Sequence, residues 1–534
     1  MPVAGLDLVE VRGQRGDLGR LAARLISFGE FHPAQREGLV QDIGVLLLAN
    51  RAHATASRAG ELLGADAFKE VRGPVSLETF RSDDVVVLLD QLDDYLETAS
   101  ENLGLFKRPE DEKGIRDLLI AIRDASEALF KDLQRMLSVP GDSSQVEIEG
   151  YVPTSRLVEF EGRLGGYLAS HEQLKKQGRY DPYVPTLLRN PRVVSVFQDL
   201  TLQKGVPNYS EIDPTPIVAL VFPVFFGIMF GDLGHGLVLV AAGLVLRSRA
   251  RYAYWGSLLL VLGASACTVG LLRGVAFGVQ FSTPWGAGGP TSLLGSGLTA
   301  ESISLILEVA VVIGAFHLTS GYALGLADRL RSGDYADALL ERLPTLTMYV
   351  SAVPLGLAIV GNGISISGIF SSGADAPLLS QAGLKVTVGV LASVTAPVFV
   401  ASIIVVAFGR PLFLFASTRS PGAASRAAAS GLVEGLARPV ELFVNTVSYV
   451  RLGVLMITTT ILGSLVADVL SAGVVGYILA GFLNLAIIAL EGVIVYVQDM
   501  RLQLYEWFSE FYTGSGRPFV PLVSGGPSFS LAFS

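Results

Sequence analysis

The residues of this sequence with the clearest chemical potential are two arginines, Arg451 and Arg501, which lie within long apolar stretches near the C-terminal end. An arginine at membrane depth costs about 2.5–3.5 kcal/mol on insertion scales, so a chain that carries two of them must gain something specific. Arginine also stays protonated under physiological conditions. A carboxylate brought beside such a cation has its pKa lowered and releases its proton.

Polar side chains accompany each arginine at helical spacing. Steps of three, four or seven residues place a set of side chains on one face of a helix. The first set comprises Glu434, Arg438, Glu441, Asn445, Ser448 and Arg451, and the second comprises Asn484, Glu491, Gln498, Arg501 and Tyr505. Lipid does not tolerate such stripes, so we expect them to face each other, a partner or a water-filled path.

Two interpretations of the arginines follow from the residues alone. In the first, Arg451 and Arg501 are buried structural residues that are satisfied by Glu441, Glu491 and backbone carbonyls. In the second, the carboxylates, amides and hydroxyls line an aqueous ion path and the arginines set its electrostatic field. The presence of two arginines on matched stripes favours the second interpretation.

The composition indicates a membrane protein with room for a separate soluble domain. The chain has 534 residues, 50% of them hydrophobic, and a mean hydropathy of +0.50. Its net charge of -9 argues against nucleic acid as a partner. The single cysteine, Cys267, excludes an intramolecular disulfide, and the N-terminal segment lacks the apolar core of a cleavable signal peptide.

The sequence predicts no bound metal or cofactor and no catalytic site. The five histidines show no metal-ligand spacing, and no GxxxxGK[ST] loop for a nucleotide phosphate occurs. Two histidines belong to other patterns. Asp232 and His235 flank the glycine-rich reversal FGDLGHG and are interpreted as helix-capping residues, whereas His317 is expected to bond a neighbouring helix.

A change of composition near residue 213 divides the chain. We expect a soluble domain over 1–213, a membrane domain over 214–513 and a C-terminal tail over 514–534. In the soluble domain, strand patterns near residues 6–11 and 146–148 surround helical patterns at about 34–64, 83–104 and 112–137. The predicted fold is mainly α, with N-terminal α/β caps joined by long coiled-coil helices.

The membrane domain contains about eight apolar spans, of which the last two are long enough to be tilted. The second span is short for a full crossing. The spans lie near 214–230, 234–247, 254–274, 303–325, 344–361, 386–408, 437–466 and 473–503. Arginines gather in the loops after the second, fourth and sixth spans, so the positive-inside rule predicts that both termini and the soluble domain are cytoplasmic.

Four segments carry a resemblance to a known family. They are VPTLLRNPRVVSVFQDLTLQKGVPNYSEIDPTPIVALVFPVFFGIMFGDLGHG, VEIEGYVP, VNTVSYVRL and EGVIVYVQDMRLQLYEWFSEFYTGSGRPFVP. They resemble subunit a, or subunit I, of V-type and A-type rotary ATPases of the archaeal and bacterial type. The resemblance covers the whole membrane half and only the layout of the soluble half. Tyr151 stands where the family usually has Trp, and Asp499 is less typical of it.

The resemblance implies a membrane stator subunit that translocates protons against a rotating ring of c subunits, the proteolipids. Arg451 matches the principal arginine of the family, Arg501 the second, and Glu491 an acidic half-channel residue. We predict that the path is formed by Arg451, Arg501, Glu491, Glu441, Asn445, Ser448 and Gln498. The implied partners are the c-ring, peripheral-stalk subunits, a central-stalk cap subunit and the lipid bilayer.

Two other classes of function remain compatible with the composition. A stand-alone secondary transporter or channel would also carry polar stripes in its membrane helices, but it should show internal repeats, and the two halves of the membrane part are not similar. A structural membrane anchor for a soluble complex would fit the stalk-like N-terminal half. Such an anchor would have no use for the two arginine stripes.

Overall fold

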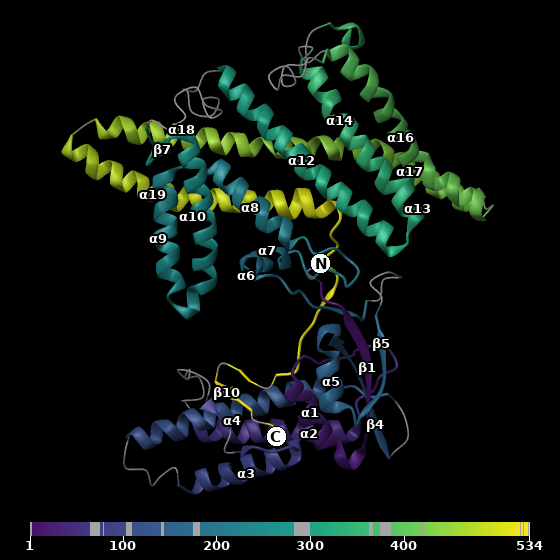
Figure 1. Ribbon diagram of the computed structural model, residues 1–534, viewed down its shortest axis with the longest axis vertical. Helices are drawn as coiled ribbons and strands as arrows, with labels where there is room; N and C mark the ends of the chain where they lie inside the picture. The colour runs from purple at the N-terminus through teal and green to yellow at the C-terminus, as the bar shows by residue number, and fades with distance from the viewer. Residues whose placement is uncertain are drawn as a thin grey trace. The chain divides into compact units, whose positions relative to one another are not determined.

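The computed structural model describes residues 3–64, 75–77, 80–102, 109–139, 144–174, 182–281, 300–361, 367–373, 386–418, 421–471, 473–523, 525–526, 528–531 and 533 (Figure 1). Its contacts define two compact units. One consists of Met1–Arg189 together with Ser515–Ser534, and the other of Asn190–Gly514. The boundary between the two units lies at residue 189, whereas the composition changes near residue 213. The two positions differ because residues 190–213 pack within the second unit.

A four-stranded sheet forms one end of the first unit. Its order is β2-β4-β1-β5, with β1 (Leu6–Gln14) antiparallel to both β4 (Gln145–Pro153) and β5 (Leu168–Gln173). The short β2 (His32–Pro33) pairs with β4 at the edge. Helices α1 (Leu18–Phe28) and α5 (Leu157–Leu164) contribute Phe28 and Phe160, whose rings lie 5.1 Å apart in the core. The predicted strands at both positions are confirmed.

Three long helices complete the first unit and confirm the predicted helical patterns, except that the first begins at Ile43 and not near residue 34. They are α2 (Ile43–Leu63), α3 (Val85–Asn102) and α4 (Pro109–Arg135), and α2 packs against both of the others. Buried alanines such as Ala49 and Ala52 of α2 share one hydrophobic core with Ile122 and Leu129 of α4. Small side chains at these positions let the helices approach closely.

The C-terminal segment is built into this first unit. β9 (Arg517–Pro518) pairs in parallel with β6 (Pro185–Thr186), and β10 (Phe529–Ser530) pairs in parallel with β3 (Val75–Ser76). Leu522, Phe529 and Leu531 are buried in the same core as the long helices. The last twenty residues therefore contribute apolar area to a domain whose other strands and helices precede the membrane segments.

The second unit is composed of apolar helices. Among the residues that the structure describes, six helical segments are long and apolar enough to cross a membrane, whereas the first two predicted spans form the 15-residue helices α8 (Thr215–Met229) and α9 (Leu233–Arg247). The longer helices are α10 (Ala253–Arg273), α12 (Ala300–Ser332), α14 (Leu343–Gly361), α16 (Val388–Thr418), α17 (Pro421–Ser448), α18 (Val450–Leu470) and α19 (Val474–Arg501). In the count of six, α17 and α18 contribute to one span, Gly431–Leu470.

Short elements connect these helices. They are α6 (Arg192–Ser195), α7 (Gln198–Leu202), η5 (Ala250–Tyr252), β7 (Val275–Ala276), β8 (Val279–Gln280), α13 (Tyr335–Asp337), η6 (Ala338–Arg342), η7 (Ile369–Ser371), η8 (Leu502–Trp507) and η9 (Phe508–Glu510). Of these, η6 and η8 are π-helical. In the first unit, η1 (Arg15–Asp17) and η4 (Thr154–Arg156) precede α1 and α5.

The reversal between α8 and α9 is held by Asp232. Its carboxylate accepts the backbone N–H of His235 at 3.0 Å and those of Phe277 and Gly278 at 2.8 Å. This confirms the predicted cap. Beyond it, α9 and α10 touch through glycines, since a Cβ at Gly236 would lie 2.6 Å from the backbone nitrogen of Cys267. Figure 1 shows these two helices side by side.

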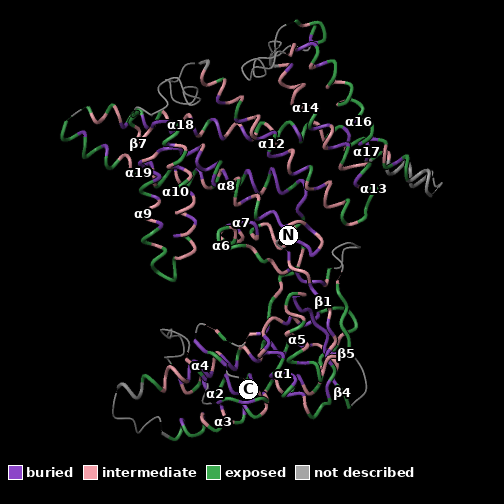
Figure 2. Tube along the Cα trace, viewed as in Figure 1, coloured by how far each residue is buried: buried purple, intermediate pink, exposed green. Residues whose placement is uncertain are grey.

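The final two long helices, α18 and α19, pack against each other and run across the direction of α9 and α10 (Figure 1). Many of their apolar residues are exposed, and Figure 2 colours part of α19 as exposed. Val474, Tyr477 and Phe482 are each more than half exposed. Such a surface is suited to lipid or to another membrane subunit.

Candidate functional site

Arg451 lies in the first turn of α18, directly after a break in the helix at Tyr449. Its guanidinium donates to Glu506 Oε1 at 2.5 Å and to Gln498 Oε1 at 3.3 Å. The Arg451 side chain is 24% exposed and that of Glu506 only 6%. The arginine is thus an ion-paired cation that remains reachable from outside the chain.

A ladder of polar contacts joins α17 and α18 to the final helix. Because residue numbers rise on one side of the ladder as they fall on the other, these helices run antiparallel. The contacts are Asn445 with Glu510 at 3.0 Å, Arg451 with Glu506 and Gln498, and Thr459 with Glu491 at 2.5 Å. We call this line of acids, amides, one hydroxyl and one cation the polar seam. It consists of Asn445, Arg451, Thr459, Glu491, Gln498, Glu506 and Glu510.

The π-helical segment Leu502–Trp507 sets which residues face this seam. A π-helical turn holds about one residue more than an α-helical turn, so the side chains after it are rotated by about one position. Gln498 faces inward, and in an unbroken α-helix Tyr505, two turns later, would face inward as well. Because of the π-helical turn, Glu506 faces inward instead. Tyr505 is 72% exposed, and Glu506 and Glu510 are 5% and 3% exposed.

Several predicted residues lie elsewhere. Arg501 is exposed on α19 and makes no ion pair with a described residue. Glu441 pairs with Arg438 at 3.1 Å, and the Ser448 hydroxyl donates to the backbone oxygen of Val444. The interpretation in which Glu441 and Glu491 satisfy the two arginines is therefore wrong, because an acid beyond the predicted end of the span pairs with Arg451.

Three buried residues of the seam, namely Glu506, Glu510 and Thr459, were not among the predicted site residues. Glu506 and Glu510 follow the predicted span, which ended at residue 503, and lie four residues apart. That spacing is a helical signal, but the surrounding aromatic residues resemble an interfacial segment. Asp499, next to Gln498, is also fully buried.

A rigid aromatic cluster supports the helix break beside Arg451. The Tyr449 hydroxyl lies 2.8 Å from Nδ1 of His317 on α12, which confirms the prediction that His317 bonds a neighbouring helix. The His317 ring stacks on Trp507 at 4.8 Å, and the Trp507 indole donates to the Ser320 hydroxyl at 3.1 Å. A Cβ at Gly314 would lie 2.2 Å from the Tyr449 ring. Tyr449 is thereby fixed two residues before the arginine.

At the other end of α18, Asn484 and Arg273 lie near Asp232. His235 Nε2 lies 2.7 Å from Asn484 Oδ1, which connects α9 to α19. Arg273 is 7% exposed and donates to the backbone oxygen of Gly231 at 3.1 Å and to the Thr460 hydroxyl at 2.6 Å. This second cation therefore ties the α8–α9 reversal to α18.

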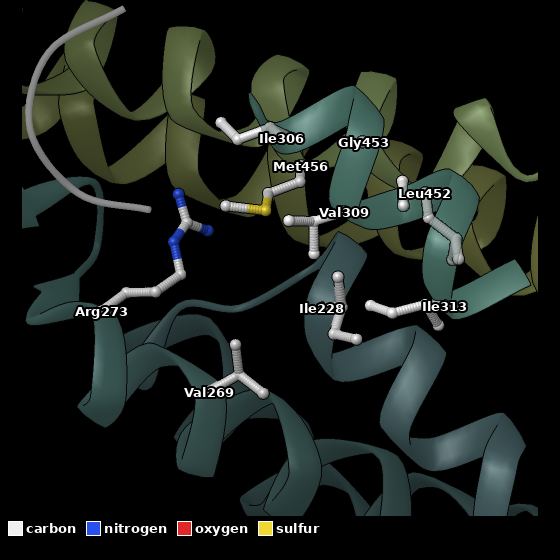
Figure 3. Close-up of a pocket in the computed structure, with 10 residues that line it drawn as sticks. Ile228, Val269, Arg273, Ile306, Val309, Ile313, Leu452, Gly453 and Met456 are labelled. Carbon is white, nitrogen blue, oxygen red and sulfur yellow. The ribbon is translucent and has the colours of Figure 1, made fainter. Parts of the chain in front are cut away.

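Figure 3 shows a cavity of about 90 Å³ beside Arg273. Its wall is otherwise apolar and includes Leu452, Gly453 and Met456 of α18, which follow Arg451 in the sequence. Among the described residues, no group of three His, Cys, Asp or Glu side chains could hold a metal ion. The carboxyl, amide and hydroxyl groups around α18 are of the kinds that can donate or accept hydrogen bonds, and carboxyl groups can transfer protons.

Comparison with known proteins shows one consistent similarity. Residues 88–253 match the V-type ATPase 116kDa subunit family. The chain is 30% identical over 350 residues to A-type ATP synthase subunit I of Pyrococcus abyssi, covering 64% of this chain and 48% of that protein. It is 26% identical over 513 residues to the subunit of the same name from Saccharolobus solfataricus, covering 83% and 68%.

A third relative, from Halobacterium salinarum, is also named A-type ATP synthase subunit I. It is 27% identical over 494 residues, which cover 76% of this chain and 66% of that protein. The matches to the Pyrococcus abyssi and Pyrococcus horikoshii proteins span only about half of those proteins' length, 48% in each case. With its six apolar helices, the chain is an integral membrane protein.

Proposed function

Because the chain is related to subunit a (subunit I) of V-type and A-type rotary ATPases, we propose that it is the membrane stator subunit of such a complex. In this proposal it supplies two half-channels for protons and the arginine that separates them. Its partners are the ring of proteolipid c subunits, the peripheral stalks and a central-stalk cap. The chain has no nucleotide site of its own in this scheme.

The observation that carries the proposal is the position of Arg451 in the polar seam. A permanent cation lies between acids and amides on two long apolar helices, and its side chain is still 24% exposed. A ring carboxylate that approaches this face can compete with Glu506 for the guanidinium. Bidentate contacts between arginine and carboxylate are among the strongest in proteins, which suits a transient partner of this kind.

The mechanism follows from the cost of charge in lipid. A ring carboxylate travels through lipid in its neutral form, because the ionised form is not tolerated there. When it meets Arg451, the cation favours its ionised form and the proton leaves through one half-channel. The carboxylate takes a proton from the other half-channel before it returns to lipid.

The two half-channels are assigned to opposite ends of the seam. Glu491, buried and bonded to Thr459, lies toward one end, and Asn445, Ser448 and Glu441 lie toward the other. Gln498 lies between them at Arg451. The exposed Arg501 is available to the ring. The arginine-rich loops support an orientation with both termini in the cytoplasm, in the cell membrane of a prokaryote.

The experiment that tests this proposal is ATP-driven acidification of vesicles that contain the whole complex. We expect Arg451→Ala to abolish acidification while the complex still assembles, and Asp468→Asn on the exposed far end of α18 to retain it. Repeating the assay without sodium determines whether protons are the ion moved. Normal pumping by the Arg451→Ala complex would refute the role assigned to the arginine.

A further inference from the structure

Glu510 is a buried carboxyl that the arginine mechanism does not use. It ends the helical segment after α19 and is 3% exposed. Asn445 donates to its Oε1 at 3.0 Å, and the Tyr322 hydroxyl faces the same carboxyl. Two groups that can exchange hydrogen bonds therefore contact this acid within the membrane unit.

The nearby cations are engaged with other acceptors. Arg438 donates to Glu441 at 3.1 Å and to Glu434 at 3.4 Å, while Arg342 donates to the backbone oxygen of Glu510 at 2.7 Å. Within the described part of the chain, no cation lies within ion-pair distance of the Glu510 carboxyl. A buried carboxylate without such a partner is costly, which distinguishes Glu510 from an acid held in a structural ion pair.

The comparison with Glu506, one turn earlier, is informative. Glu506 forms an ion pair with Arg451 at 2.5 Å, whereas Glu510 accepts a hydrogen bond from the side-chain amide of Asn445 at 3.0 Å. Two acids on one face of one helix thus have opposite environments. Such a difference is typical of carboxyls with different proton-transfer roles.

Glu510 also lies between an exposed and a buried part of the seam. On one side, the side chains of Glu434 and Glu441 are 38% and 48% exposed. On the other side, Asn445 leads along α17 toward Arg451. Glu510 therefore lies on the line of polar side chains that leads from the exposed Glu434 and Glu441 to Asn445 and Arg451.

We propose that Glu510 is a proton-carrying residue of the half-channel at the Arg438 end of the seam. Its carboxylate accepts a proton from a water molecule on the side of Glu441 and then donates it to a water molecule on the side of Asn445. The carboxylate is regenerated and no electrons are transferred. This inference rests on the proposed function and adds to it a residue that the sequence analysis did not assign.

The titration of Glu510 takes place among several other groups. Glu441 opposes a negative charge there, whereas Arg438, Arg342 and Lys204 favour it. The ionisable side chains around it come from α12, α14, α17, α18, η6 and the segment before α8, and they are Tyr322, Tyr349, Arg438, Glu441, Tyr449, Arg342 and Lys204.

The test uses the whole complex in vesicles and compares wild type with Glu510→Gln, Glu510→Asp and the exposed control Asp468→Asn. We expect Glu510→Gln to assemble and to pump at least tenfold more slowly, because a positioned carboxyl in proton transfer contributes about 10²–10⁴-fold. Glu510→Asp should recover part of the rate. The ratio of the wild-type pumping rate to the Glu510→Gln pumping rate should grow as the pH on the proton-donating side rises, because free protons become scarcer there.

The pH profile separates a proton carrier from a structural residue. A Glu510→Gln complex that pumps within twofold of wild type, or that loses the same factor at every pH, would overturn this inference. If Glu510→Gln does not assemble, a Glu510→Asp complex with the wild-type pH profile and a uniform loss would also overturn it. Failure of the proposed function is recognised separately, by pumping that persists in Arg451→Ala.

Discussion

Arg451 and Glu506 form the central ion pair of the seam, at 2.5 Å and with the glutamate nearly buried. Desolvation of two charges costs free energy, so such a pair contributes little net stability. Removing one partner is nevertheless expensive, because it leaves the other charge buried and uncompensated. The pair therefore holds the arginine in place, and a carboxylate that competes for Arg451 has to offset the cost of leaving Glu506 without its partner.

A double-mutant cycle on this pair gives a prediction that does not depend on transport. Glu506→Gln should lower the free energy of unfolding by about 3–5 kcal/mol, the usual cost of an orphaned buried charge. Arg451→Gln combined with Glu506→Gln should cost less than the sum of the two single changes, by at least about 1 kcal/mol. Denaturant unfolding of the full chain in detergent measures this. Additive losses would mean that the two side chains are energetically independent.

Helix packing determines where the arginine lies, and Gly314 of α12 is the critical contact. A Cβ at this position would lie 2.2 Å from the Tyr449 ring and 2.4 Å from its Cβ. Tyr449 has no room to move, since it is fully buried and bonded to His317. Either α12 or the helix break must therefore shift if Gly314 acquires a side chain.

We predict that Gly314→Ala lowers the free energy of unfolding by about 1–3 kcal/mol, as overpacking does in tight cores. The matched control is Gly481→Ala on α19, where nothing lies within 4 Å of the added Cβ. That change should be neutral or stabilise by up to about 1 kcal/mol, because alanine is the better helix former. Thermal unfolding of both variants provides the comparison. Equal effects would show that Gly314 is not a packing requirement.

The same elements show what periodicity can predict. Apolar runs located the membrane helices, and the polar stripe on the last span indicated that Glu491 and Gln498 face inward. The stripe failed at Arg501, which is exposed on α19. It failed again at Tyr505, because a pattern search assumes 3.6 residues per turn and η8 is π-helical. The break at Tyr449 has no proline or glycine next to it in the sequence. It depends on contacts with α12, which are more than 130 residues away.

At the scale of the whole chain, the C-terminal segment links the two ends of the sequence. After the membrane segments, residues 515–534 return to the first unit and complete its core. Val520 meets His32, whose Nδ1 lies 3.0 Å from both the nitrogen and the oxygen of that residue. Val523 donates its N–H to Asp132 at 2.6 Å. The attachment of the segment therefore involves two titratable side chains.

These two side chains respond to acid in opposite ways. Burial lowers the pKa of His32 from 6.5 to about 4, and the charges of Arg135 and Arg517 act in the same direction. The folded state therefore binds fewer protons than the unfolded state between these values, and stability falls as the pH drops through this window. Burial raises the pKa of Asp132 to about 6 from 3.8, so its titration stabilises the fold on acidification.

We predict that the attachment at Val520 weakens as the pH falls from 6.5 toward 4 and that His32 causes this. One proton linked to opening changes amide protection by at most about tenfold per pH unit. Hydrogen exchange at residues 519–523, corrected for its intrinsic pH dependence, should show a steeper loss of protection in wild type than in His32→Gln. His171→Gln, which alters a histidine with a 48% exposed side chain in β5, is the control and should behave as wild type. If the His32→Gln chain shows the same pH slope as wild type, the acid response belongs to another group and the prediction is wrong. Asp132 is present in both proteins, so its titration does not contribute to the difference between them.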